Sequence, residues 1–321
     1  MNSLHPATGC TLIYCKDRLL HIELTTGNCV DYINLPSDLS APPIHCTHLL
    51  DSFYAIVSPQ TPSAVVFLQR DGNSSSIHAT AQLHSHILRI SATKYTSQSS
   101  LLCISAQTKI FLFTISVHFN RISLSLSYFA DTSPNPDAAF SLTTTTSHWT
   151  LVHLGLPKSS IVVKRQGQES LCKESLHAQP ISKICSHEKG GRMLIGTTSR
   201  SGRNIRIWKE EKKEILKISK DLKRGTSQAT PFSLVFSHDA EMIALSTKKS
   251  SIHVFGVFNE FHSVIKYGSV VSSKYEHHSA NVFFTSHKLV GFLFSKNKES
   301  CVIIESGLLN SENHAQLLSE F

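Results

Sequence analysis

Two segments of this chain, Met193–Trp208 (MLIGTTSRSGRNIRIW) and Met242–Phe255 (MIALSTKKSSIHVF), are near-copies of each other. Each contains a short apolar strand, a turn rich in hydroxyl and basic residues, and a second strand that ends in an aromatic residue. Equivalent positions lie about 47 residues apart, the length of one four-stranded blade of a β-propeller. The repeat therefore predicts a propeller, and Leu222-Lys223-Arg224-Gly225 lies between its two copies.

Strand signals continue on both sides of this repeat. Residues 101–105, 109–117 and 121–129 predict three consecutive strands joined by short turns, as in a meander. Short strands at regular spacing are typical of a sandwich, a barrel or a propeller, and the blade-length repeat favours the propeller. At about 46 residues per blade, the 321 residues amount to roughly seven blades. We expect an all-β, seven-bladed, WD40-like β-propeller that forms a single domain over residues 1–321.

Helical periodicity is weak throughout the chain. The best candidate for a helix is the short tail at Glu312–Phe321. The mixed charges of residues 209–213 (KEEKK) predict a solvated hairpin turn.

The bulk composition indicates a folded chain with anionic partners. Hydrophobic residues make up 40%, which is enough for a sizeable core, and Lys and Arg exceed Asp and Glu by 31 − 23 = 8. A positive excess favours nucleic acid, an acidic membrane surface or an acidic protein, and does not choose among them. No recognisable nucleic-acid-binding module accompanies the charge, so no nucleic-acid partner is expected.

The cysteines and the apolar runs indicate a cytoplasmic protein. The eight cysteines are scattered and form no metal-ligand spacing, so we expect reduced thiols, no metal and no cofactor. The N-terminal residues lack the layout of a signal peptide, and no apolar run approaches the roughly 18 residues that span a bilayer. Contact with a membrane would therefore be peripheral.

The segment LKRGTSQAT, followed by FSHDAEMIALSTKKSSIHVF, resembles the PROPPIN (WIPI-type) β-propellers. Their hallmark is a Phe/Leu-Arg-Arg-Gly segment followed by Phe-Ser-x-Asp, a cluster of small and hydroxyl residues, and Thr-x-His-x-Phe. GRNIRIW is similar to the family's Gly-Thr-x-Ile-Arg-x-Phe strand. The match spans about Met193–Phe255, near a fifth of the chain, and several spaced elements occur in order.

The resemblance implies a seven-bladed propeller that binds phosphatidylinositol 3-phosphate and phosphatidylinositol 3,5-bisphosphate at two sites on its rim. By position, the first site would use Thr197, Ser199, Gly202, Arg206 and Lys223. The second would use Arg224, Gly225, Thr247, Ser251 and His253.

The chemistry of these residues suits phosphate. Hydroxyls and backbone N–H groups donate to phosphate oxygens, and Arg supplies a bidentate fork. Ser251 and His253 are two residues apart, so on a strand they face the same side. Protonation of His253 would strengthen its contact with a phosphate.

Two residues depart from the family pattern. Lys223 replaces the first Arg and lacks its planar fork, which predicts a weaker first site. Arg203 replaces the Thr that follows the Gly, and it adds positive charge.

Residues 258–278 predict a long loop at the position of the family's membrane-inserting loop, between the third and fourth strands of blade six. The resemblance implies that its apolar side chains enter the interface, with Lys266 and Lys274 near the headgroups. These side chains are Phe258, Phe261, Val264, Ile265 and Tyr267.

Each residue also has a structural interpretation. Lys223 and Arg224 can form a solvated corner between blades, and Arg206 can be an exposed strand residue beside Trp208. His253 can be an interstrand histidine, hydroxyls are common in propeller turns, and the loop aromatics can pack against the propeller edge.

Among functions, the sequence favours a non-enzymatic phosphoinositide effector and scaffold. By resemblance, it would act in autophagy or endolysosomal trafficking, with trafficking or autophagy proteins as partners. Its expected location is the cytoplasm and the surface of autophagic, endosomal, vacuolar or lysosomal membranes. The alternative is a WD40-like protein-interaction scaffold without lipid binding. No nucleophile elbow, nucleotide loop or credible carboxylate pair indicates an enzyme.

Overall fold

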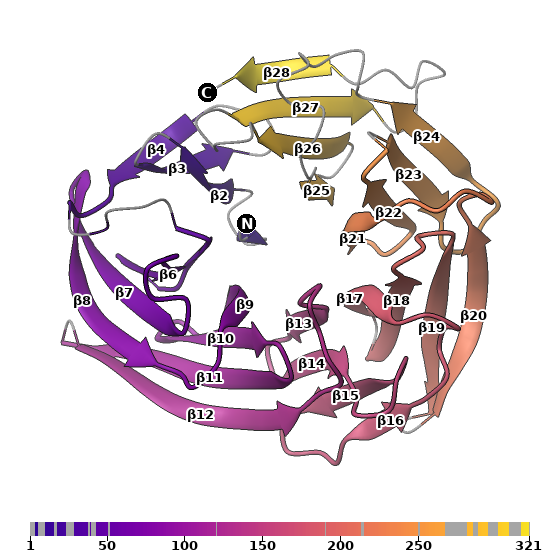
Figure 1. Ribbon diagram of the computed structural model, residues 1–321, viewed down its shortest axis with the longest axis horizontal. Helices are drawn as coiled ribbons and strands as arrows, with labels where there is room; N and C mark the ends of the chain where they lie inside the picture. Colours follow the sequence, from indigo (N-terminus) through magenta and orange to yellow (C-terminus); the bar gives the residue numbers. More distant parts are fainter. Residues whose placement is uncertain are drawn as a thin grey trace. The chain divides into compact units, whose positions relative to one another are not determined.

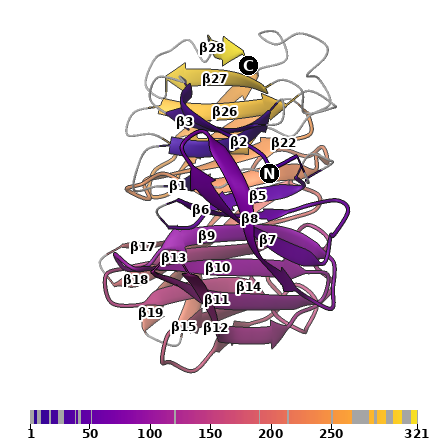
Figure 2. The ribbon, with the colours of Figure 1, turned by 90° about the vertical axis from the view of Figure 1, so that its left-hand side faces the viewer.

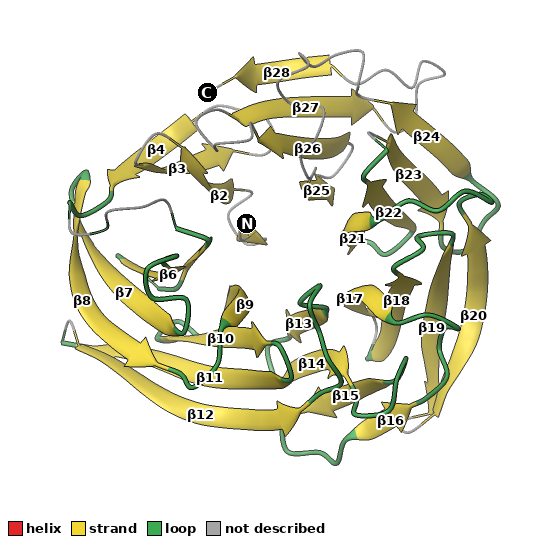
Figure 3. Cartoon of the chain, in the orientation of Figure 1, coloured by secondary structure: helices red, strands yellow, loops and turns green. Residues whose placement is uncertain are grey.

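A computed structural model describes most of the chain (Figure 1). The described residues are 4–5, 10–15, 18–23, 29–37, 39, 43–50, 52–119, 121–189, 191–212, 215–249, 251–266, 281–284, 288–294, 301–307 and 316–320. Every regular element among them is a β-strand, and Figure 3 draws no helix in this part of the chain. The prediction of an all-β protein is confirmed.

The described strands form seven four-stranded antiparallel sheets, each made of strands consecutive in the sequence. The first sheet contains β1 (Leu4–His5), β2 (Cys10–Cys15), β3 (Arg18–Glu23) and β4 (Cys29–Asn34). The second contains β5 (His45–His48), β6 (Phe53–Val57), β7 (Ala64–Asp71) and β8 (Ser74–Gln82). The third contains β9 (Ile87–Lys94), β10 (Ser99–Ala106), β11 (Lys109–His118) and β12 (Arg121–Asp131), which confirms the predicted meander (Figure 2).

Four further sheets follow in chain order. The fourth contains β13 (Phe140–Thr144), β14 (Trp149–Leu154), β15 (Ile161–Arg165) and β16 (Leu171–Lys173). The fifth contains β17 (Ile181–Lys189), β18 (Arg192–Ser199), β19 (Asn204–Lys212) and β20 (Ile215–Lys223). The sixth contains β21 (Pro231–Phe236), β22 (Met242–Thr247), β23 (Ser251–Gly256) and β24 (His262–Lys266). The seventh contains β25 (Asn281–Phe284), β26 (Lys288–Phe294), β27 (Cys301–Gly307) and β28 (Gln316–Glu320).

The chain divides into two compact units. Unit 1 comprises Met1–Ala138 and Thr144–Thr150, and unit 2 comprises Ala139–Thr143 and Leu151–Phe321. The first three sheets lie in unit 1, and the fifth, sixth and seventh lie in unit 2. All the candidate site residues belong to unit 2.

Inner strands of the second and third sheets contain much of the core of unit 1. β6 (FYAIV) is buried along its whole length, because one face joins an apolar cluster with the third sheet and the other joins a cluster with the first; β10 (SSLLCISA) is also buried along its whole length. In unit 1, one apolar cluster joins Phe53 and Phe67 of the second sheet to Leu102 and Ile104 of the third.

The core of unit 2 has the same construction. One cluster joins Val152 of the fourth sheet to Ile195 and Trp208 of the fifth. A second cluster joins Ile207 of the fifth sheet to Ile243 and Phe255 of the sixth. These two clusters fix the strands on which the candidate site residues lie.

Three local predictions are wrong. The tail predicted as a helix contains strand β28 at residues 316–320. The charged segment at 209–213 is strand through Lys212, and Glu210 is buried because it pairs with Arg165 of the neighbouring sheet. The segment predicted as a loop over 258–278 contains β24 at residues 262–266, which pairs with β23.

Candidate functional site

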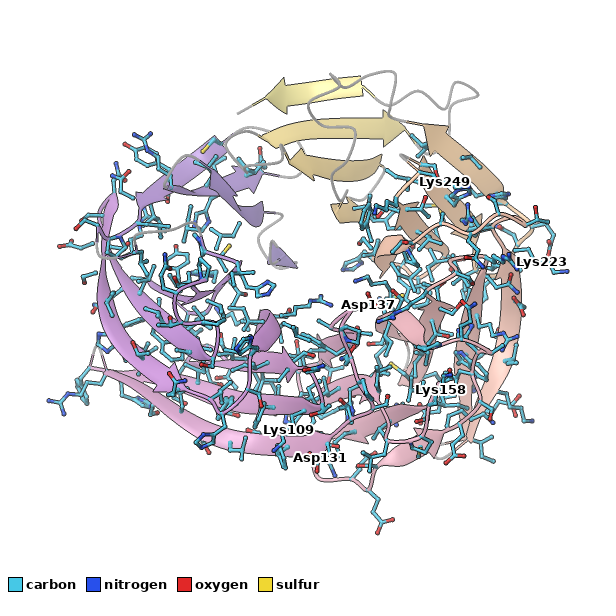
Figure 4. All side chains as sticks on the ribbon, in the orientation of Figure 1. Lys109, Asp131, Asp137, Lys158, Lys223 and Lys249 are labelled. Carbon is cyan, nitrogen blue, oxygen red and sulfur yellow. The ribbon has the colours of Figure 1, made fainter. Side chains whose placement is uncertain are left out.

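The LKRG segment lies at the end of the fifth sheet. β20 ends at Lys223, which lies opposite Asn204 of β19, and Arg224 donates its backbone N–H to the Arg203 carbonyl at 2.7 Å. Lys223 is exposed and Arg224 is half-buried, because consecutive residues of an extended chain point to opposite sides. Figure 4 labels Lys223 at this end of β20. Within the described residues, the Lys223 ammonium forms no ion pair or hydrogen bond.

Backbone carbonyls hold the Arg224 side chain in place. Its Nε donates to the Gly202 carbonyl at 2.6 Å, and Nη2 donates to the Ser227 carbonyl. Nη1 donates to no residue in the described part of the chain. Burial lowers the pKa of Arg224 from its ordinary value. The guanidinium is thus fixed by two bonds and keeps one nitrogen for a further acceptor.

Gly202 shapes the turn between β18 and β19. Its φ is +59°, and a Cβ at this position would lie 2.1 Å from the Ala229 carbonyl oxygen. Its N–H donates to the Ser199 carbonyl at 2.9 Å. The N–H group proposed to bind phosphate at Gly202 is therefore already used within the turn, and the residue positions Arg224 through its carbonyl.

Arg206 already has anionic and carbonyl partners. Its Nε donates to Asp221 Oδ2 at 3.1 Å, and Nη1 donates to the Leu176 carbonyl. Arg206 and Asp221 lie opposite each other on β19 and β20, and Lys223 lies two residues beyond Asp221 on the same side. A phosphate here would meet two cations and one carboxylate.

The Thr197 hydroxyl is buried in a polar network of the fifth sheet. The Trp208 indole Nε1 donates to it at 3.0 Å, and His177 Nε2 lies 2.9 Å from it. Ser199 is also buried, and its hydroxyl lies 3.0 Å from the Ser201 hydroxyl. These two residues stabilise the turn around the first site, and both hydroxyls already have protein partners.

Three residues of the second site, Thr247, Ser251 and His253, form a row on the sixth sheet, while Arg224 and Gly225 lie in the connection that follows β20. Thr247 and Ser251 are register partners on β22 and β23, and their hydroxyls lie 3.0 Å apart. Ser251 Oγ lies 3.3 Å from His253 Nε2, so the predicted common face of these two residues is confirmed in the structure. His253 Nδ1 is buried and has no hydrogen-bond partner among the described residues. A buried polar atom of this kind is able to form a hydrogen bond with an incoming group.

Burial and nearby charges keep His253 neutral. They lower its pKa to about 4, with burial the largest cause, followed by Arg224 and His262. Its ring stacks beside those of Phe255 and His262. His253 is therefore uncharged near pH 7 in the free chain and offers hydrogen bonds, not positive charge, to an incoming group.

The turn between β23 and β24 is short and spans residues 257–261. Phe258 is 53% exposed and Phe261 is 39% exposed, as a membrane-contact role requires. Val264 and Ile265 instead lie in strand β24, and Ile265 is buried. The loop assignment is thus wrong for these two residues. Tyr267, Lys274 and the Lys266 side chain lie outside the described residues.

Lys220 fixes this turn, and no sequence pattern pointed to it. Its Nζ donates to the Gly256 carbonyl at 3.3 Å and to the Asn259 carbonyl, and it lies 3.4 Å from a Glu260 carboxylate oxygen. The contact joins β20 to the turn that carries the two exposed phenylalanines. Lys248 and Lys249, exposed at the β22–β23 turn, were also not proposed as site residues, and Figure 4 labels Lys249.

His177 and Asp221 are the other missed residues. Asp221 directly precedes the LKRG segment, so the sequence alone could have indicated a carboxylate beside the two cations. His177 lies in the connection before β17 and reaches Thr197 only through folding.

The described residues contain no cluster of His, Cys, Asp and Glu able to hold a metal ion. They also contain no helix of the length and apolarity needed to cross a membrane. The site chemistry is that of anion recognition by fixed cations, hydroxyls and one neutral histidine.

Solved structures share this architecture. Hsv2 of Kluyveromyces marxianus is 12% identical, with a TM-score of 0.70 over 100% of this chain and 97% of that chain. KlAtg21, solved in complex with the coiled coil of AgAtg16, is 14% identical, with a TM-score of 0.71 over 100% of this chain and 98% of that one. The β-propeller domain of Cps50 (Swd1) from Myceliophteria thermophila is 10% identical, with a TM-score of 0.62 over 95% and 94%.

No protein-family model matches the chain. Hsv2 and Atg21 are both PROPPIN β-propellers, so the resemblance predicted from the LKRG segment is confirmed at the level of fold. The Swd1 domain shows that the fold also occurs in propellers outside this group, so the fold alone does not define the function.

Proposed function

We propose that this chain is a non-enzymatic, seven-bladed propeller that binds phosphatidylinositol 3-phosphate or phosphatidylinositol 3,5-bisphosphate on membranes. It acts as an effector and scaffold in autophagy or endolysosomal trafficking. The observation that carries the proposal is the LKRG segment, which presents an exposed Lys223 on one side and a fixed Arg224 on the other. The seven four-stranded sheets and the likeness to Hsv2 and Atg21 support the architecture.

Arg224 and the sixth sheet support a phosphate site of defined chemistry. Arg224 is close enough to His253 to lower the pKa of that histidine, and the Thr247–Ser251–His253 row lies on the same sheet. Arg224 supplies charge, the two hydroxyls and the imidazole supply hydrogen bonds, and burial strengthens each of these contacts. This arrangement favours an inositol phosphate over a carboxylate, because a phosphate offers more acceptor oxygens.

In the first site, a carboxylate competes with phosphate for the cations. Lys223 is a flexible point charge, and Arg206 must exchange the Asp221 carboxylate for a phosphate oxygen. We therefore assign the stronger binding to the second site. Two linked sites facing one membrane raise the overall affinity by about 10²–10⁴, so a weak first site still contributes on vesicles.

The exposed Phe258 and Phe261 give the proposed membrane face an apolar contact. Lys220 holds their turn against β20, and exposed Lys248 and Lys249 add positive charge in the sixth sheet. Each cation near an anionic surface contributes about 1 kcal/mol. Protein partners would bind elsewhere on the chain; Atg21 has been solved in complex with the coiled coil of Atg16.

The test is co-sedimentation with vesicles that contain or lack phosphatidylinositol 3-phosphate. We expect the wild-type chain to pellet only with the lipid and Lys223→Ala/Arg224→Ala to lose most of this binding. The matched control is Lys209→Ala/Lys217→Ala, which removes the same charge from β19 and β20 of the same sheet. Equal loss of vesicle binding in both variants would indicate nonspecific electrostatic attraction to the membrane.

One result would favour the alternative function. If the folded wild-type chain binds neither phosphatidylinositol 3-phosphate nor the bisphosphate, the lipid proposal fails. The exposed lysine and fixed arginine would then be a corner between sheets, and the chain would be a WD40-like protein-interaction scaffold.

A further inference from the structure

β12 is the last strand of the third sheet, beside β11, and no other described strand pairs with its outer edge (Figure 1). A strand in this position presents backbone N–H and C=O groups that another chain can pair with. Proteins commonly protect such edges with charged side chains or proline. β12 spans Arg121–Asp131 (RISLSLSYFAD), and neither protection occurs between its two ends.

β20, the edge strand of the fifth sheet, shows the usual pattern. Its nine residues (ILKISKDLK) include four charged side chains. β12 is two residues longer, with eleven, yet it is charged only at its first and last positions. β8 (SSSIHATAQ), the edge of the second sheet, also lacks charge, but its one large exposed apolar side chain is Ile77, so β12 is the edge that combines an uncharged interior with a row of exposed apolar side chains.

The apolar side chains of β12 form an exposed row. Ile122, Leu124 and Leu126 lie opposite Val117, Ile115 and Phe113 of β11, and therefore on one face of the sheet. Leu124 is 37% exposed and Leu126 is 56% exposed. At the tip of the same hairpin, Phe119 is fully exposed at a φ of +50°, a conformation that bulky residues rarely adopt.

We propose that β12 pairs in antiparallel fashion with β12 of a second copy of this chain, with Leu124 on the two-fold axis. In this register, Leu124 faces Leu124 of the copy, Ile122 faces Leu126, and Ser123 faces Ser125. Residues directly opposite in an antiparallel pair lie on the same face. The apolar row therefore meets an apolar row, and serines meet serines.

This self-complementarity is the reason to choose a second copy as the occupant. Ile122-Ser123-Leu124-Ser125-Leu126 has the same polarity pattern in both directions, so one two-fold axis satisfies every pair. No like charges face each other, because the two Arg121 side chains lie at opposite ends of the paired segment. At about 3.3 Å per residue, they are about 20 Å apart.

A β-bulge limits the length of the pairing. The register of β12 against β11 shifts between Leu112 and Phe113, where Ser127 is the extra residue. The Ser127 hydroxyl lies 2.6 Å from the Thr114 hydroxyl. Regular pairing therefore covers Ile122 to Leu126 only, because Arg121 would face the bulged Ser127, and a bulge interrupts the ladder and increases the local twist. A short interface of this kind predicts a dimer that dissociates on dilution.

Sedimentation velocity of the purified full chain, without lipid, tests the proposal from about 1 to 100 µM. We expect the mass to rise from one chain towards two, and Leu124→Lys/Leu126→Lys to weaken the dimer by about tenfold or more. The control is Val30→Lys/Ile77→Lys, which places the same charges at exposed apolar positions on β4 and β8. A wild-type chain that stays monomeric at the highest concentration overturns the proposal, and so does equal weakening by the control.

Cross-linking tests the register without depending on the stability of the lysine variant. A short bis-maleimide should link Leu124→Cys chains to dimers more efficiently than Leu126→Cys chains, since only residue 124 faces its own equivalent. The wild-type chain gives the background from native thiols such as the exposed Cys29 and Cys172. Cross-linking no greater than this background in both variants excludes the proposed pairing.

Discussion

At the scale of single residues, the Asp221 carboxylate determines how strongly the cations of the first site can bind a phosphate. Its carboxylate accepts from Arg206 at 3.1 Å and lies two residues from Lys223, so it competes with any phosphate for both cations. We predict that Asp221→Asn raises the affinity for vesicles with phosphatidylinositol 3-phosphate about two- to fivefold, since an exposed ion pair is worth about 0.2–1 kcal/mol.

The measurement is a vesicle titration of the variant beside Asp71→Asn. Asp71 lies at the end of β7 in unit 1, so this control makes the same change in net charge far from the site in sequence. Unchanged or weaker binding of Asp221→Asn would count against a phosphate at Arg206.

Gly202 is the residue whose backbone conformation the site requires. We predict that Gly202→Ala lowers the free energy of unfolding by about 1–3 kcal/mol through the positive φ alone, and by more through the contact with the Ala229 carbonyl. Because the Gly202 carbonyl accepts from Arg224, lipid binding should fall as well.

Urea unfolding measures this change, and Gly167→Ala separates its two causes. Gly167 has a φ of +69° with nothing within 4 Å of a Cβ, so it reports the strain without the clash. Equal losses for the two variants would show that the close approach to Ala229 adds nothing.

At the scale of elements, a buried ion pair joins the fourth sheet to the fifth. Both guanidinium Nη atoms of Arg165 on β15 donate to the Glu210 carboxylate on β19, each at 2.7 Å, and the Met193 N–H donates to it at 3.3 Å. Removing one partner leaves a buried charge uncompensated. We predict that Glu210→Ala costs about 3–5 kcal/mol of the free energy of unfolding.

The matched variant is Glu211→Ala, one residue further along the strand. Glu211 pairs with Lys217, and both side chains are about half exposed, so its loss should cost under about 1 kcal/mol in the same denaturation experiment. Similar costs for the two variants would contradict the difference in burial.

This pair also shows where sequence reasoning failed. The segment KEEKK has the composition of a solvated turn. Glu210 can be buried because it pairs with Arg165, which lies 45 residues away in the sequence. The strands of the core, the meander and the common face of Ser251 and His253 follow from local alternation and were predicted. Contacts between residues far apart in the sequence, such as those of Lys220 and His177, depend on tertiary placement and leave no local pattern.

For the candidate site, the sequence indicated which charged residues to expect, and it did not indicate the hydrogen bonds that hold them. The LKRG segment suggested Lys223 and Arg224, whose role in binding stays a prediction. It did not indicate that Arg206 is bound to Asp221 or that the Thr197 hydroxyl is engaged by Trp208. The loop after β23 is also shorter than predicted. His262–Lys266 is a short strand that pairs with β23, and no pattern in the sequence indicates this pairing.

At the scale of the whole molecule, buried histidines make stability depend on pH. The pKa values of His21, His153, His177 and His253 are each lowered from 6.5 to about 4, with burial as the largest cause. The unfolded chain binds protons first as the pH falls, so their contribution is fully present above about pH 6.5 and is lost towards pH 4.

We predict that the free energy of unfolding decreases steadily between pH 6.5 and 4 in urea titrations. His153, which is nearly inaccessible, should account for a decrease on the order of 3 kcal/mol, and His153→Gln should flatten the profile. His118→Gln, at an exposed position, serves as the control. A profile that His153→Gln leaves unchanged would exclude this histidine as a source.

The order of the strands also has a consequence for how the chain acquires its structure. Each sheet uses four strands that are consecutive in the sequence, so most backbone pairing joins residues close together along the chain. Local pairing of this kind has a small loop-closure cost and favours rapid formation. During synthesis, each sheet can begin to form once about 45 residues have left the ribosome, before the next has been translated. The order of translation is thus also an order of assembly, from the first sheet to the seventh.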